Sequence, residues 1–167
     1  VDVSHLVNLT AQYSSDIPSA TALILNDSEE SPFKGLIRIE MGLPGPNFFT
    51  LSTVAKEISL FASSNHEFKF TDVKILSNIL IQYWNIIKKI HEEEWNDVKE
   101  TRPNRKYKLL ETTGFIALSR FAGPILQRAI INETLENING TTIFEINWNF
   151  IENILKNTTT KIDWDKK

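Results

Sequence analysis

The residues best suited to chemistry are few and form no recognisable set. The three histidines are His5, His66 and His91, and none belongs to a His-Glu-x-x-His pair with metal-ligand spacing. Three glutamates follow His91 directly, but consecutive residues do not share a helix face. The chain has no cysteine, which excludes disulfides, thiolate catalysis and cysteine-based metal sites. We therefore expect no metal site and no cofactor.

Motifs for nucleophilic catalysis and for phosphate binding are also missing. There is no Gly-x-Ser-x-Gly string for an activated serine. Residues 42–45 read Gly-Leu-Pro-Gly, but they lack the Lys-Ser/Thr ending of a phosphate loop and are typical of a rigid turn. Because no acid–base pair or nucleophile is visible, we expect no catalytic residue, and an enzyme is the least favoured class.

One stretch joins positive charge to the expected start of a helix, and it is the candidate site for DNA or another anion. It consists of Lys99, Arg102, Arg105, Lys106, Lys108, Thr112, Thr113 and Gly114. Hydroxyls and a glycine at a helix start can present backbone N–H groups to a phosphate. An ordinary helix cap, with Gly114 allowing close packing, also explains the Thr-Thr-Gly string, and we favour it because such caps are common. A solvated loop likewise explains the basic run.

The overall charge limits how DNA could be bound. The net charge is −3 and the pI is about 5.7, whereas a dedicated nucleic-acid domain usually has a strongly basic face. Any binding should therefore be weak, salt-dependent and directed at the phosphate backbone. Trp84 and Trp95 offer stacking surfaces for bases, but core packing is the favoured role for both.

The element expected to organise the chain is a helix over residues 71–91. Its apolar residues step by three or four along one stripe, which widens past half of the circumference, so other segments must cover it. Thr71 should cap its start, and His91 should complement its negative end together with two lysines. The stripe consists of Leu76, Leu80, Tyr83, Ile87 and Ile90.

The remaining segments predict a mainly α domain with one or two short strands. Pro18 should break the chain, and Ser19 should cap a helix over residues 20–26. A short strand is expected over residues 36–40, and a helix should run from Thr50 or Ser52 to Phe61. A helical face ends at residues 123–124, and a further helix should run from Pro124 to about Glu136. The last helix should begin at Asn147 or Asn149.

Length and composition predict one soluble domain. The chain has 167 residues, of which 41% are hydrophobic, enough to bury a core. No apolar run reaches the roughly 18 residues of a membrane span, and no signal peptide is visible, so we expect no membrane association. The sequence opens with Val rather than Met, and we expect it to be a fragment of a longer protein.

Three sets of segments, taken in order, resemble a known family. Residues 22–27 (Ala-Leu-Ile-Leu-Asn-Asp) are followed by residues 31–37; residues 47–54 lead to 80–88 and Trp95; and residues 107–118 include Leu-Leu-Glu-Thr-Thr-Gly-Phe. Together they resemble the C-terminal half of DGQHR-domain proteins, the group that includes DndB-like proteins of DNA phosphorothioation and related DNA-modification systems. The match covers about residues 20–122.

The resemblance has two departures. The Asp-Gly-Gln-His-Arg string is absent, so a ParB-like N-terminal domain would lie upstream of Val1. Glu111 stands where the pattern has Lys before Thr-Thr-Gly, which inverts the charge beside the candidate anion site. No catalytic residue of the family maps onto this chain. The resemblance implies an intracellular, cytoplasmic protein of prokaryotes.

Two hypotheses follow for the function. The leading one is a non-catalytic helical domain of a DndB-like protein, acting in DNA binding, regulation or assembly in a DNA-modification system. The alternative is a helical protein–protein interaction or oligomerisation module unrelated to nucleic acid. Partners would be DNA in the first case, and other proteins or a second copy of the chain in the other.

Overall fold

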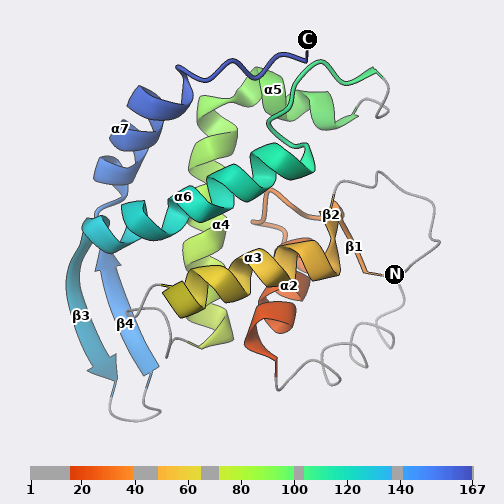
Figure 1. Ribbon diagram of the computed structural model, residues 1–167. Coiled ribbons are helices and arrows are strands. Elements are labelled where there is room, and N and C mark those ends of the chain that lie inside the picture. Colours follow the sequence, from red (N-terminus) through yellow and green to blue (C-terminus); the bar gives the residue numbers. More distant parts are fainter. Residues whose placement is uncertain (1–15, 40–48, 65–71, 100–103, 137–140, 167) are drawn as a thin grey trace.

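The computed structural model describes residues 16–39, 49–64, 72–99, 104–136 and 141–166 (Figure 1). These residues are mainly helical, with two small two-stranded sheets, so the expected fold class is confirmed. The α-helices are α2 (Ile17–Asp27), α3 (Leu51–Ser64), α4 (Val73–Ile90), α5 (Glu92–Asn96), α6 (Thr112–Ala129) and α7 (Trp148–Thr159). A 3-10 turn, η2, covers Asp97–Lys99, and the strands are β1 (Ile37–Arg38), β2 (Phe49–Thr50), β3 (Ile130–Glu136) and β4 (Thr141–Ile146).

Helix α4 is the buried centre that its apolar stripe predicts. Leu76, Leu80, Tyr83 and Ile87 are all buried, and α2, α6 and α7 pack against the helix. Asp72 is the N-cap, since its carboxylate accepts a hydrogen bond from the Ile75 N–H at 2.8 Å. The expected cap, Thr71, lies outside the described residues.

Aromatic side chains fill the core between α4, α6 and the parallel pair of strands β1 and β2. Trp84 stacks on Phe115 with ring centroids 5.4 Å apart, and Phe33 meets both rings edge-on. Phe49, on β2, lies 4.4 Å from the Phe115 centroid. Trp84 and Trp95 are each 3% exposed, so both are core residues rather than stacking surfaces for bases.

The start of α2 differs from the prediction. The helix begins at Ile17, and Pro18 lies within its first turn instead of breaking the chain. Proline is tolerated there because the first N–H groups of a helix have no intrahelical partner. Ser19 is therefore a buried helical residue and not the cap; its hydroxyl donates to the carboxylate of Asp16.

The segment after residue 123 was also predicted wrongly. Helix α6 continues through Pro124 to Ala129, and residues 130–136 form strand β3 instead of a helix. Strand β3 pairs antiparallel with β4, with Ile130 opposite Ile146, and the hairpin connects α6 to α7 (Figure 1). Proline costs one backbone hydrogen bond, but Ala122, Ile125 and Leu126 are buried around it, and this packing keeps the helix intact.

The C-terminal part follows its prediction. Asn147 caps α7 by accepting a hydrogen bond from the Phe150 N–H at 3.0 Å, and Ile151 and Leu155 are fully buried. Trp164 docks against the body and donates from Nε1 to the Thr159 carbonyl at 3.1 Å. None of the described helices combines the length and apolar character needed to cross a membrane.

Candidate functional site

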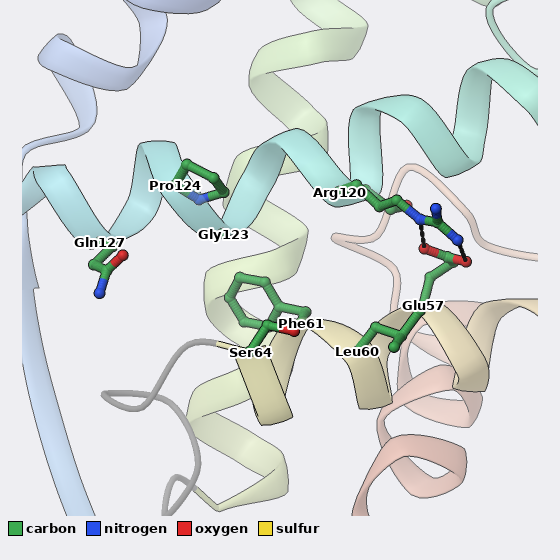
Figure 2. Close-up of a pocket in the computed structure, with 9 residues that line it drawn as sticks. Glu57, Leu60, Phe61, Ser64, Arg120, Gly123, Pro124 and Gln127 are labelled. Atoms are coloured by element: carbon green, nitrogen blue, oxygen red, sulfur yellow. Dashed lines mark hydrogen bonds and ion pairs between the residues drawn. The ribbon is translucent and has the colours of Figure 1, made fainter.

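A cleft of about 540 Å³ lies between α3 and α6, and it is the candidate site considered first (Figure 2). Pockets of this size are typical of ligand sites. Its two walls are the facing sides of the two helices. It is lined by Glu57, Leu60, Phe61, Ser64, Ser119, Arg120, Gly123, Pro124 and Gln127.

An ion pair between Glu57 and Arg120 spans the cleft at one end (Figure 2). The Arg120 Nε–H donates to one carboxylate oxygen at 3.3 Å, and Nη2 donates to the other at 3.5 Å. The Glu57 side chain is 3% exposed, whereas that of Arg120 is 60% exposed. The anion therefore belongs to the floor of the cleft, and the cation is the part that solvent or a ligand can reach.

The sequence places Glu57 in this position because it lies on the buried stripe of α3. Val54 and Phe61 are three residues before it and four after it, and both are buried. Glu57 also borders a second, small cavity of about 20 Å³, which Phe115 and Ala122 line as well. A charge against apolar groups must be paired, and Arg120 supplies the partner.

The rest of the cleft is mostly apolar. Leu60 is 38% exposed, and Figure 2 shows the Phe61 ring pointing from α3 toward Pro124 on α6. Ser64 and Gln127 add polar groups at the end away from the ion pair. The arrangement can hold an elongated amphipathic group, with its apolar part between the helices and its polar part at Arg120.

The predicted anion-binding residues are only partly brought together. Lys106, Lys108, Thr112 and Thr113 are exposed, but Arg105 is buried, with 9% of its surface exposed. Arg102 lies outside the described residues, and Lys99 ends η2.

Acidic groups interrupt this basic stretch. Asp97 accepts hydrogen bonds from the N–H groups of Lys106 and Tyr107, at 2.8 and 3.0 Å. A depression of about 500 Å³ beside these residues is lined by Glu93, Asp97, Lys106 and Tyr107, together with two asparagines. The hydrogen bond from the Tyr107 hydroxyl to the Glu93 carboxylate raises the pKa of Tyr107 to about 12. Two carboxylates thus lie beside Lys106, one of the cations predicted to meet a phosphate.

Gly114 is explained by close packing at the start of α6. A Cβ atom at this position would lie 2.4 Å from the Lys108 carbonyl oxygen and 2.5 Å from that of Leu109. Two carbonyl oxygens therefore pack closely against the first turn of α6, where only glycine fits. This is the packing role that the sequence favoured for the glycine.

His91 is the C-cap of α4, where its backbone N–H donates to the Ile87 carbonyl, and its imidazole is buried. Its Nε2 lies 2.8 Å from the Thr159 hydroxyl, and its ring meets Trp164 edge-on. Among the residues that the structure describes, no three His, Asp or Glu side chains form a group that could hold a metal ion. His5 and His66 lie outside those residues.

Sequence reasoning missed the α3–α6 cleft. Its two charged residues are 63 positions apart, so their pairing leaves no local motif. One signal was present: Glu57 is a charged residue on an otherwise apolar helical stripe, between Val54 and Phe61. Such a residue needs a partner from another element.

Comparison with known proteins does not assign the chain to a family. No family model matches the chain, and no match was found among curated proteins or solved structures. The resemblance to DGQHR-domain proteins therefore stays a prediction from the sequence.

Proposed function

We propose that this chain is a non-catalytic binding domain that holds a segment of a protein partner in the cleft between α3 and α6. The observation that carries the proposal is the cleft itself, an apolar trough with an exposed Leu60 and a single ion pair at one end. Glu57 is buried against Arg120, and an arginine keeps its proton in proteins, so the pair presents no exposed general acid or base. Such a trough suits the apolar face of a partner segment.

The setting of this domain is part of the proposal and rests on the sequence resemblance alone. A DndB-like protein would use the domain for assembly or regulation within a DNA-modification system. The same cleft serves equally in an interaction module unrelated to nucleic acid.

The test is selection of short random peptides, displayed on phage, against the full chain. Selected peptides should lose binding when Ser64→Tyr fills the cleft, because Ser64 lines it. Ser63→Tyr is the matched control, since Ser63 is an exposed neighbour on α3 that does not line the cleft. Peptides that bind both variants like the wild type, or failure to select any peptide, would overturn the proposed function.

DNA binding is a second candidate, favoured by one observation. Lys106, Lys108, Thr112 and Thr113 are exposed together near the start of α6, where Glu111 makes no side-chain cap. Free N–H groups and cations there would meet phosphates. Because Asp97 and Glu93 lie beside Lys106, binding should be weak and confined to low salt.

A fluorescence titration with duplex DNA at low and moderate salt tests this candidate. The variant is Lys106→Glu with Lys108→Glu, which leaves the buried Arg105 in place. It should weaken binding to all duplexes alike and flatten the salt dependence. Lys156→Glu with Lys161→Glu, an equal charge change at exposed residues elsewhere, is the control. No binding by the wild type at low salt, or equal loss in both variants, would exclude this site.

A further inference from the structure

We infer that the partner segment bound in the α3–α6 cleft presents a carboxylate to Arg120 and an apolar side chain to the trough beside it. This inference rests on the proposed function and adds the chemistry of the partner. It is carried by the unequal burial of Glu57 and Arg120 and by the donors of Arg120 that Glu57 leaves unused.

The guanidinium of Arg120 has N–H donors that Glu57 does not use. Arginine carries five N–H groups, and Glu57 accepts from Nε and from Nη2. Both N–H groups of Nη1 and the second one of Nη2 therefore remain. One from each nitrogen forms a parallel fork whose spacing matches the two oxygens of a carboxylate.

Burial decides which member of the ion pair meets the ligand. A cationic ligand would have to displace Arg120 to reach Glu57, whose side chain is 3% exposed. A carboxylate can instead bind the outer edge of Arg120 while Glu57 keeps its partner. Breaking the pair would leave a buried charge uncompensated, so the second arrangement is the favoured one.

Glu57 also prepares Arg120 for this contact, which makes it a positioning residue. An exposed arginine ordinarily loses rotamer freedom when it binds a ligand. The two hydrogen bonds to Glu57 hold the guanidinium across the cleft before any ligand arrives (Figure 2).

The apolar walls of the cleft require the partner segment to carry an apolar side chain. Leu60, Phe61 and Pro124 offer an apolar surface next to the ion pair. Of the lining residues in the described structure, only Glu57 and Arg120 carry charge, so selection by charge depends on Arg120. A partner that places Asp or Glu beside a large apolar side chain satisfies both features.

The first experiment examines the composition of the selected peptides and measures the affinity of one of them, labelled with fluorescein. The selected peptides should be enriched in Asp or Glu next to an apolar residue, and amidation of that acid should weaken binding at least about tenfold, as for a charged hydrogen bond. Arg120→Gln should have a similar effect. Arg128→Gln, at an exposed arginine on the same helix that does not line the cleft, should have none.

A second pair of variants keeps the test independent of the ion pair, in case Arg120→Gln fails to fold. Leu60→Glu and Leu60→Lys remove the same exposed apolar contact but introduce opposite charges. An acidic partner requires the Glu variant to bind the wild-type peptide more weakly than the Lys variant. Equal binding, or weaker binding by the Lys variant, would overturn the inference.

The same selection separates this inference from the proposed function. Peptides that lack an acid but still lose binding with Ser64→Tyr would refute the acidic partner and keep the cleft as a protein-binding site. Peptides whose binding is unchanged by Ser64→Tyr would refute both the acidic partner and the proposed function.

Discussion

Tyr83 on α4 donates a hydrogen bond to the backbone carbonyl of Leu118 on α6, with 2.8 Å between the two oxygens. The tyrosine is fully buried, so its hydroxyl needs this partner. The contact ties the central helix to the helix that forms one wall of the cleft.

Tyr83→Phe should lower the free energy of unfolding by about 1 kcal/mol, the usual net value of a buried hydrogen bond. Urea denaturation measures it, and the slope of the unfolding free energy with urea should not change. A variant as stable as the wild type would show that the hydrogen bond adds nothing to the packing of α4 on α6.

Alkaline pH should destabilise the protein through the same residue. Burial raises the pKa of Tyr83 above its usual value, whereas in the unfolded chain tyrosine ionises near pH 10. Above about pH 10 the unfolded chain releases a proton that the folded chain keeps, so the free energy of unfolding falls by up to about 1.4 kcal/mol per pH unit. Denaturation at several alkaline pH values should show that the free energy of unfolding falls less with pH for Tyr83→Phe than for the wild type. If the free energy of unfolding falls equally in the variant and the wild type, the pH dependence belongs to other titratable groups.

Leu80→Ala should cost about 2–5 kcal/mol, because it removes a buried side chain from the centre of the core. Leu60→Ala, at a leucine that is 38% exposed, is the control and should cost much less. Thermal melting compares the two. Equal losses would contradict the central position of α4.

Gly114→Ala should destabilise the fold by about 1–3 kcal/mol, because the new Cβ would press on the carbonyls of Lys108 and Leu109. Thr113→Ala, at the exposed neighbouring residue, should stay within about 0.5 kcal/mol of the wild type. Urea denaturation checks both. A Gly114→Ala variant that is more stable than the wild type would mean that helix propensity outweighs the close contact.

Local periodicity predicted the helices whose apolar residues face a single core. Helix α4 is the clearest case, and Leu51, Val54, Ile58 and Phe61 of α3 are all buried as their spacing implies. These elements are predictable because one stripe of side chains determines both the helix and its buried face.

Features that depend on distant segments were not predictable in this way. Strand β3 needs β4 as its partner, and the Ile130–Ile146 pairing joins residues whose local sequence does not show it. In the sequence, Pro124 predicts the end of one helix and the start of another. In the structure, packing around Ala122 and Leu126 keeps α6 continuous through it. The cleft depends on the folded approach of Glu57 to Arg120, which no local pattern determines.

The C-terminal segment and the basic segment share one pair of backbone hydrogen bonds. The Lys108 N–H donates to the Trp164 carbonyl, and the Lys166 N–H donates to the Lys106 carbonyl, each at 2.7 Å. Because each segment protects an amide of the other, neither amide can exchange its hydrogen with solvent unless the two segments separate. The amides of Lys108 and Lys166 should therefore exchange together, as one local opening unit.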